Sequence, residues 1–149
     1  MQKIILFFSS VCGVGYIKYV SGTFGSAAAL IFWLFIPDDY KIQAVFIIAA
    51  IIVSVITSSY AERIYDNIDD GRIVIDELCG MWISVFMLPK TPFFLIAGFL
   101  LFRFFDIKKP LFINKLQELK AGLGITADDV AAGIFANIIL QIIHRCQIV

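Results

Sequence analysis

Long apolar stretches separated by short polar segments dominate the chain, and this pattern predicts helices. Pro89 and Pro92 interrupt the longest stretch, and proline disfavours helix at its own position and at the residue before it. The pattern therefore predicts about five hydrophobic helices, several of them shorter than the roughly 20 residues that span a bilayer. The four stretches are Phe24–Ile36, Ile42–Ser59, Ile73–Phe105 and Ala127–Ile143.

A helix of a different kind is expected between the third and fourth stretches. Apolar positions there recur at helical spacing and charged positions fall opposite them, which is typical of a short helix lying in the membrane interface. The apolar positions are Phe112, Ile113, Leu116 and Leu119, and the charged ones are Lys115, Glu118 and Lys120.

The amino-acid composition indicates that these helices lie in a lipid bilayer. Of the 149 residues, 60% are hydrophobic, which is above the ~45–50% of ordinary soluble domains. The 12 basic and 12 acidic residues are too few to coat a core of this size, so the surplus apolar surface is expected to face lipid. The expected fold is all-α, a polytopic membrane helical bundle formed by residues 1–149 as a single domain.

The charges are unevenly distributed along the chain. One membrane crossing per predicted helix brings three polar segments to one side: the residues before Phe24, Glu62–Glu77 and Arg103–Asp129. By the positive-inside rule, eight basic residues there against three on the other side predict that this side is cytoplasmic. The eight are Lys18, Arg63, Arg72, Arg103, Lys108, Lys109, Lys115 and Lys120, and the three are Lys41, Lys90 and Arg145.

A candidate phosphate site lies where the first predicted helix opens, at Gly22–Ser26. The free N–H groups and the positive end of the dipole make a helix start a seat for phosphate, and the hydroxyls of Thr23 and Ser26 can donate to it. The alternative is that Thr23 or Ser26 only caps the helix and that the glycines allow close packing.

Two pairs of neighbouring acids are candidate metal ligands. Asp76 and Glu77 begin a hydrophobic helix, where carboxylates are costly to desolvate without a partner, and Mg²⁺ binds through carboxylates, water and substrate phosphate. The alternative, complementing the helix dipole, explains one acid better than two. Near the last helix, Thr126 and Asp129 approximate a capping box, and Asp128 is surplus to it.

A third acid follows a basic residue at the end of a phenylalanine-rich helix. Arg103 and Asp106 are three positions apart, and Lys109 follows. This spacing fits a helix-surface ion pair. It equally fits a phosphate clamp beside a metal ligand, since arginine offers a planar fork to phosphate oxygens and lysine a point charge.

Together these groups provide what metal-assisted phosphoryl transfer requires, because carboxylates hold cations and cations neutralise the substrate. Other classes are excluded. His144 is the only histidine and is predicted to lie on the far side, so no pair of histidines can act as nucleophile and acid. The chain has no DxDx[TV], GxSxG or Walker A motif and lacks the paired-aspartate pattern of CDP-alcohol phosphotransferases. Balanced charge argues against nucleic-acid binding, and three scattered cysteines against a zinc site.

At these four motifs the chain resembles the phosphatidylglycerophosphatase A family, from about Gly13 to the last helix. The family's first motif usually carries prolines where Lys18 and Ser21 stand here, and a Trp-Pro pair where Leu111 and Phe112 stand. The matching residues are Gly22–Ser26, Ile73–Glu77 with Gly80–Trp82, Phe102-Arg103 with Asp106 and Lys109-Pro110, and Asp128-Asp129 with Ala132-Gly133.

The resemblance implies Mg²⁺-dependent hydrolysis of phosphatidylglycerophosphate to phosphatidylglycerol and phosphate in a bacterial cytoplasmic membrane. Our hypothesis is attack by a metal-activated water on the phosphomonoester, with an aspartyl-phosphate route left open. Two alternatives remain: a phosphatase of another lipid phosphate, such as phosphatidic acid, and a small ion-coupled transporter. The expected metal ligands are Asp76, Glu77, Asp106, Asp128 and Asp129, and the expected phosphate ligands are Arg103, Lys109, Thr23, Ser26 and Lys18.

Overall fold

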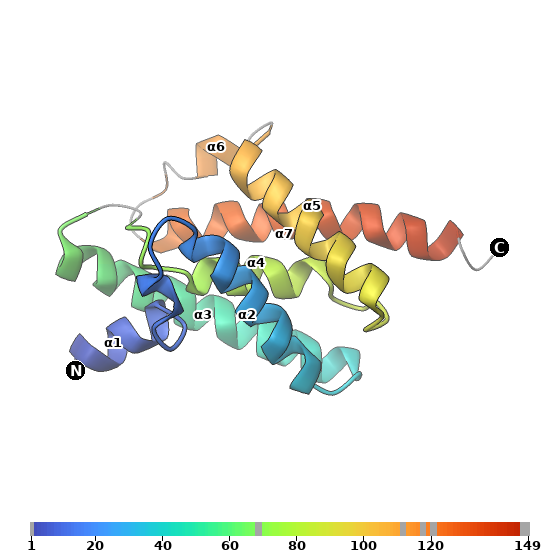
Figure 1. Cartoon of the computed structure of the whole chain (residues 1–149), viewed down its shortest axis with the longest axis horizontal. Coiled ribbons are helices and arrows are strands. Elements are labelled where there is room, and N and C mark those ends of the chain that lie inside the picture. Colours follow the sequence, from blue (N-terminus) through green and yellow to red (C-terminus); the bar gives the residue numbers. More distant parts are fainter. Residues whose placement is uncertain (1, 68–69, 111–112, 117–118, 120–121, 147–149) are drawn as a thin grey trace.

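The computed structural model describes residues 2–67, 70–110, 113–116, 119 and 122–146, and in this part of the chain all regular structure is helical (Figure 1). This confirms the expected all-α class. The α-helices are α1 (Gln2–Ser9), α2 (Ser21–Phe35), α3 (Tyr40–Tyr65), α4 (Ile75–Ser84), α5 (Pro92–Lys108), α6 (Ile113–Leu116) and α7 (Gly122–Cys146), with a short 3-10 helix at Val14–Tyr16.

Helices α3 and α7 have 26 and 25 residues and are long and apolar enough to cross a membrane. The other predicted crossings are shorter, since α2 has 15 residues, α4 has 10 and α5 has 17. The Ile73–Phe105 stretch is divided as the prolines predict. However, α4 already ends at Ser84, and Pro92 becomes the first residue of α5, where its missing N–H costs nothing.

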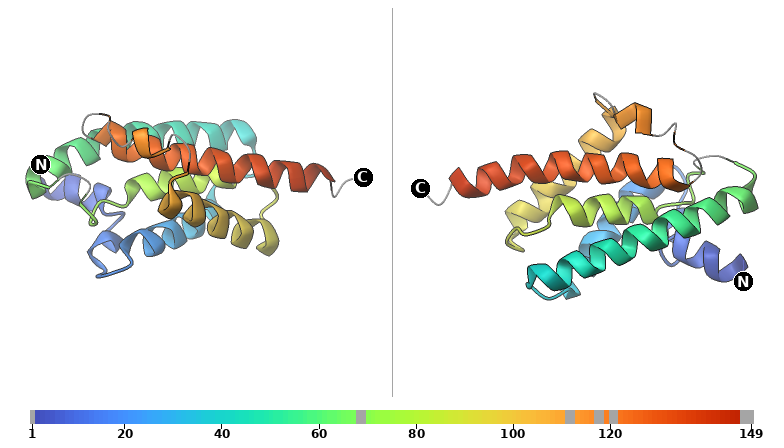
Figure 2. Two further views of the ribbon diagram at one scale, coloured as in Figure 1. Left: turned by 90° about the horizontal axis from the view of Figure 1, so that it is seen from above. Right: turned by 180° about the vertical axis from the view of Figure 1, so that it is seen from behind.

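Helix α4 occupies the centre of the bundle. Seen from behind, α7, α4 and α3 lie side by side (Figure 2), and α2 and α5 also pack against α4. Cys79 and Met81 are fully buried. The indole Nε1 of Trp82 donates to the carbonyl oxygen of Ala29 in α2 at 2.8 Å. Because this short helix is enclosed, the residues at its start have little access to solvent.

Two glycines set the spacing between α4 and α7. A Cβ on Gly133 would lie 2.3 Å from the carbonyl oxygen of Gly80, and one on Gly80 would lie 2.6 Å from the carbonyl oxygen of Asp129. Real side-chain carbons do not approach backbone so closely, so only glycine allows this contact. The contact brings the first turn of α4 next to Asp129.

The predicted amphipathic segment is only partly described. Helix α6 comprises Ile113–Leu116, with Ile113 fully buried and α6 packed against α7. Leu116 is half-buried and Leu119 is exposed. The predicted positions Phe112, Glu118 and Lys120, like the side chain of Lys115, lie outside the described residues.

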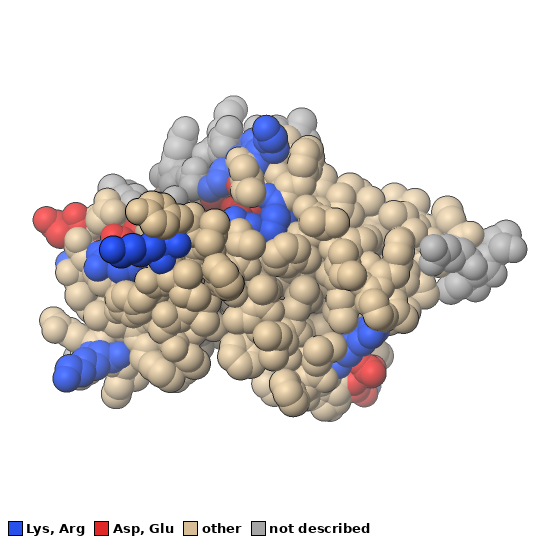
Figure 3. Space-filling model, in the orientation of Figure 1, with Lys and Arg blue, Asp and Glu red and all other residues tan. Residues whose placement is uncertain are grey.

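The outer surface is mostly apolar, and its charges gather at one end. On α5, Phe93, Ile96, Leu100, Phe104 and Ile107 are all exposed, which is the expected composition of a face toward lipid. Figure 3 shows blue and red atoms over the left and upper parts of the molecule, with a small group at the lower right and a broad tan region between. The described residues of the polar segments before α2, between α3 and α4, and between α5 and α7 therefore share one end of the bundle (Figure 1).

Candidate metal and phosphate site

The site is built around the first turn of α4, which begins at Ile75 and presents Asp76 and Glu77. Carboxylates are favoured here because the N-terminal end of a helix carries partial positive charge. Asp76 is only 6% exposed. Glu77 is half-buried as a residue, but its Oε2 has no access to solvent.

A third carboxylate comes from α7. Asp129 is 3% exposed, and one ligand oxygen each from Asp76, Glu77 and Asp129 lie within 4.8 Å of one another. The close contact between Gly80 and Gly133 holds the two helices together at this level. The structure thus brings together acids that are more than 50 positions apart in the sequence.

Three oxygens of the cluster lack a hydrogen-bond partner within the described chain. Asp76 Oδ1, Glu77 Oε2 and Asp129 Oδ2 are buried without a hydrogen-bond partner. Burial disfavours the charged form of each acid, and the other two carboxylates add like charge beside it. Unsatisfied buried oxygens are costly, and a bound cation would satisfy them.

Two ion pairs flank the cluster. Arg103 at the end of α5 pairs with Asp106, and Lys109, just after α5, pairs with Asp128 of α7 at 2.5 Å. Asp106 also lies close enough to Glu77 and Asp129 for its charge to act on both. The two remaining predicted acids therefore border the cluster, each beside one of the predicted phosphate-binding cations.

The start of α2 closes another side of the site. A Cβ on Gly22 would lie 2.2 Å from Glu77 Oε1 and 3.1 Å from Arg103 Nη1, so the absence of a side chain leaves room for both groups. Gly22 is in the first turn of α2, where backbone N–H groups lack helical partners.

The other three predicted phosphate ligands, Thr23, Lys18 and Ser26, have no described contact with the acidic cluster. Thr23 is half-buried in the first turn of α2, and Lys18 is exposed in the segment before it. Ser26 is fully buried, and its hydroxyl donates to the carbonyl oxygen of Gly22 at 2.8 Å. This hydrogen bond lies within the helix, so the proton of Ser26 is already engaged by backbone.

The capping box considered for Thr126 and Asp129 is wrong. Helix α7 begins at Gly122 rather than near Ala127, so both residues lie inside it. The Thr126 hydroxyl instead contacts the carbonyl oxygen of Gly122 and the hydroxyl of Ser54 in α3, each at 2.8 Å. Asp129 therefore does not cap the helix, and its carboxylate belongs to the acidic cluster.

The residues that support the site were not identified from the sequence. Gly22, Gly80 and Gly133 create the space in which the helices and carboxylates meet, and Ser54 ties α3 to α7. A detectable signal existed for Ser54, because a small hydroxyl residue within the apolar Ile42–Ser59 stretch is a common helix-contact residue in membrane proteins.

The donor set suits a hard divalent cation. Oxygen ligands from carboxylates are what Mg²⁺ prefers, and the three unpartnered buried oxygens of Asp76, Glu77 and Asp129 offer such ligands. Histidine and cysteine do not contribute to this group. The residues present therefore fit a divalent cation that prefers oxygen ligands, and the ion-paired side chains of Arg103 and Lys109 lie beside it.

The chain is similar to known lipid phosphatases. The sequence model of a family described as phosphatidylglycerophosphatase A matches residues 7–144. Proteins named phosphatidylglycerophosphatase A are similar in Escherichia coli, at 34% identity over 88% of this chain and 78% of the relative, and in Haemophilus influenzae, at 33% identity over 86% and 81%.

A further relative carries a different name. A Bacteroides thetaiotaomicron protein named "Putative phosphatidylinositol-3-phosphatase" is 32% identical over 87% of both chains. No solved structure matches the chain. The family match covers nearly the whole chain and includes all four motifs that carry the resemblance. The chain belongs to the phosphatidylglycerophosphatase A family of phosphatases.

Proposed function

We propose that the protein hydrolyses the terminal phosphomonoester of phosphatidylglycerophosphate, yielding phosphatidylglycerol and inorganic phosphate. The observation that carries this proposal is the group of three buried carboxylates with unpartnered oxygens, flanked by Arg103 and Lys109. Family membership supports the substrate class, since two relatives are named for this activity.

Asp76, Glu77 and Asp129 would hold Mg²⁺. Asp106 and Asp128 border them and complete the predicted set of five acids. When bound, the metal would supply Lewis acidity and lower the pKa of a coordinated water. The acids on separate helices fix the position of that charge relative to the lipid phosphate.

Arg103 and Lys109 would bind the phosphate oxygens. In the present structure each is paired with an acid, Arg103 with Asp106 and Lys109 with Asp128. A doubly charged phosphomonoester competes for both cations, because charge-assisted contacts to phosphate are strong and arginine can make them bidentate. Thr23 and Lys18, at and before the start of α2, would add a hydroxyl and a cation to the same anion site, while the hydroxyl of Ser26 donates to the carbonyl oxygen of Gly22.

The reaction needs one water for each phosphate released. The water oxygen forms a bond to phosphorus, the bond between phosphorus and the glycerol oxygen breaks, and that oxygen leaves with a proton. Arg103 and Lys109 neutralise charge on the phosphoryl oxygens as this happens, which is the main contribution that proteins make to phosphoryl transfer.

The protein would act as a multi-pass protein of the bacterial cytoplasmic membrane, with the site at the cytoplasmic face. Helices α3 and α7 are long enough to cross, and the site lies at the bundle end that carries most charges (Figure 3). This arrangement keeps the acyl chains in the bilayer while the headgroup reaches the acids. The basic residues at that end favour the cytoplasmic orientation.

The test is phosphate release by the purified protein from a panel of lipid phosphates in detergent, with Mg²⁺ or with a chelator. We expect phosphatidylglycerophosphate to be the preferred substrate and the chelator to abolish turnover. The panel includes phosphatidic acid and, because of the name of the Bacteroides relative, phosphatidylinositol 3-phosphate. Faster turnover of either would reassign the substrate, and full activity in chelator would refute the metal assignment.

A further inference from the structure

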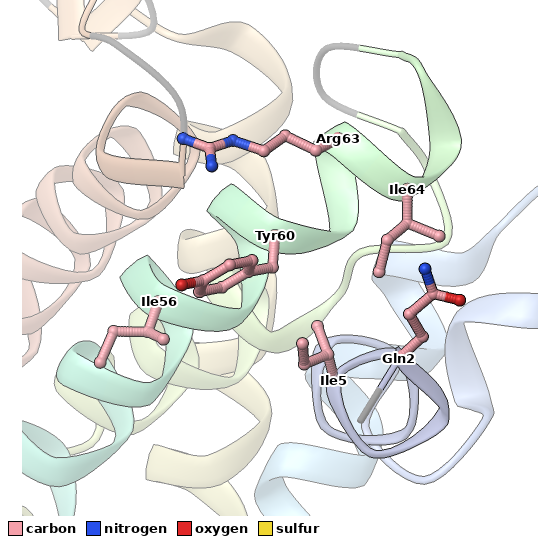
Figure 4. A pocket seen from close by; sticks show the side chains of 6 residues that line it. All are labelled: Gln2, Ile5, Ile56, Tyr60, Arg63 and Ile64. Carbon is pink, nitrogen blue, oxygen red and sulfur yellow. The ribbon is translucent and has the colours of Figure 1, made fainter.

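A surface groove between α1 and α3 is separate from the acidic cluster. It has a volume of about 790 Å³ and is lined by Gln2, Ile5, Ile56, Tyr60, Arg63 and Ile64 (Figure 4). Its volume is in the range of small-molecule sites, roughly 300–1,000 Å³. Ile56, Tyr60 and Arg63 are exposed, so the groove is open to the surroundings of the bundle.

The groove lies on the side of α3 that faces away from the catalytic residues. Ser54, Ser58 and Ala61 are buried, and Ser54 contacts α7 directly. Tyr60 and Arg63 lie on the other side of the helix, because two residues along an α-helix correspond to about 200° of rotation. A ligand in the groove would therefore contact none of Asp76, Glu77 and Asp129.

Polarity changes along the groove. Its walls toward the middle of α3 are the side chains of Ile5 and Ile56 and the ring of Tyr60 (Figure 4). Arg63 stands two residues before the end of α3 at Tyr65, seven positions beyond Ile56, which is about 10 Å along the helix. The groove is therefore apolar along most of its length and has one basic lining residue, Arg63, at the charge-rich end of the bundle.

Arg63 is available to an anion. Its guanidinium carbon lies 5.8 Å from the ring centre of Tyr60, and Figure 4 shows the side chain extending over that ring. Within the described chain, no acidic side chain forms an ion pair with it. Arg72, Arg103 and Lys109 at the same end are each paired with an aspartate.

A second hollow adjoins the first. It has a volume of about 430 Å³, shares Ile56, Tyr60 and Arg63 with the groove, and continues onto Val55 and Ser59. Two mostly apolar hollows therefore meet at one cation. This arrangement matches a molecule with two hydrocarbon chains joined at an anionic head.

We propose that the two hollows around Ile56 and Tyr60 bind the acyl chains of a resident anionic phospholipid, with its phosphate on Arg63. The ligand class is a phosphodiester lipid of the surrounding bilayer, and it is bound rather than hydrolysed. Charge complementarity carries the assignment, because an arginine that forms no ion pair in the described chain attracts anionic headgroups at a membrane surface.

The test compares two lipids with identical acyl chains, anionic phosphatidylserine and zwitterionic phosphatidylcholine. Neither carries a phosphomonoester, so the acidic cluster has no substrate to select. Native mass spectrometry of the full chain in detergent measures the dissociation constant of the first lipid bound. We expect phosphatidylserine to bind about fivefold more tightly, which corresponds to one arginine near the headgroup.

Three variants locate the site. Arg63→Gln should remove the preference for phosphatidylserine, and Ile56→Trp, which fills both hollows, should weaken binding of both lipids. Lys41→Gln is the matched control, because Lys41 lies 5.9 Å from the ring of Tyr40 at the opposite end of α3, and it should keep the preference.

Each opposite result would overturn the proposal. A wild-type protein without headgroup preference holds only general boundary lipid. A preference that survives Arg63→Gln places the anion elsewhere, and unchanged binding to Ile56→Trp places the acyl chains elsewhere. Phosphate release is not a readout of this test, so its outcome is independent of the proposed hydrolysis.

Discussion

Two buried carboxylates at the same end of the bundle, Asp70 and Asp76, have opposite electrostatic surroundings. In the segment between α3 and α4, the oxygens of Asp70 accept from Arg72 Nε at 2.6 Å, Arg72 Nη2 at 2.9 Å and Asn67 Nδ2 at 3.1 Å. Hydrogen bonding to Arg72 lowers the pKa of Asp70 to about 2. Six positions later, Asp76 is equally buried, but its Oδ1 has no partner.

The difference shows that burial does not by itself mark a functional acid. Asp70 is 8% exposed and Asp76 is 6% exposed, yet only Asp70 has its charge neutralised by its own chain. Asp76 shares its surroundings with Glu77 and Asp129, which add negative charge. An uncompensated cluster is expensive for a fold to keep, so it implies a partner from outside the chain.

The sharpest way to break this comparison is to remove one carboxylate from the acidic cluster and to compare it with removal of an exposed acid outside both the cluster and the Asp70 segment. Asp129→Asn should lower phosphate release by at least about 100-fold, the usual scale for losing one stabilising group at a reaction centre. The folded state should survive, because the change removes an unpaired charge. Asp38→Asn is the control, since Asp38 pairs with Lys90 and its side chain is 77% exposed.

Initial rates in detergent and a melting curve for each variant are the measurements. Turnover of Asp129→Asn within a few-fold of wild type would remove Asp129 from the site. An equal loss of turnover in Asp38→Asn would show that the assay responds to charge in general.

The next largest effect is expected from the contact between α4 and α7. The acidic cluster depends on this contact, whereas the segment around Asp70 does not. Gly133→Ala places a carbon 2.3 Å from the backbone oxygen of Gly80, and such overpacking costs about 1–3 kcal/mol. We expect a lower melting temperature and reduced activity, since α4 and α7 must separate.

Gly71→Ala is the matched control for this experiment. The added carbon there would meet nothing closer than Ser21 Oγ at 3.8 Å. A melting temperature of Gly133→Ala equal to that of Gly71→Ala would contradict the tight packing of α4 on α7.

A smaller effect is expected from Asp70→Asn. The change removes the ion pair to Arg72 and should cost about 1 kcal/mol, because the arginine side chain is 42% exposed and water screens the pair. Thermal unfolding should shift by about 2–4 °C, while turnover of the folded protein stays at the wild-type level. A large loss of turnover without loss of stability would assign Asp70 to the reaction instead.

The smallest effect is the pH dependence of that stabilisation. The folded pKa of Asp70, about 2, is below its ordinary value of 3.8, so the ion pair contributes fully above about pH 4 and is lost as the pH falls through about 2. The difference in melting temperature between wild type and Asp70→Asn should therefore shrink over this range. A constant difference from pH 6 to pH 2 would show that Asp70 does not titrate as described.

The positions of several site residues on their helices could be predicted from where charged residues stand relative to the apolar stretches of the sequence. Asp76 and Glu77 were expected at the start of a helix, and they lie in the first turn of α4. Arg103 and Asp106 were expected to pair or to form a clamp, and they pair. These predictions rest on local spacing, and helix geometry converts spacing into position with little help from the rest of the fold.

Helix ends were less predictable. The last helix was expected from Ala127 and begins at Gly122, and the half before Pro89 ends at Ser84. Apolar content determines that a segment is buried or faces lipid, but it does not determine where hydrogen bonding stops. Polar residues such as Thr126 can continue a helix when a neighbouring helix offers a partner, as Ser54 does.

The sequence by itself determined the helical class, the apolar surface and the gathering of acids and bases at one end, because each follows from composition and from local periodicity. Only the tertiary structure decided that Asp129 joins Asp76 and Glu77 while Asp128 turns to Lys109. Neighbouring residues on a helix point about 100° apart. The choice between them therefore depends on how α7 is rotated against α4, which the contact between Gly80 and Gly133 fixes.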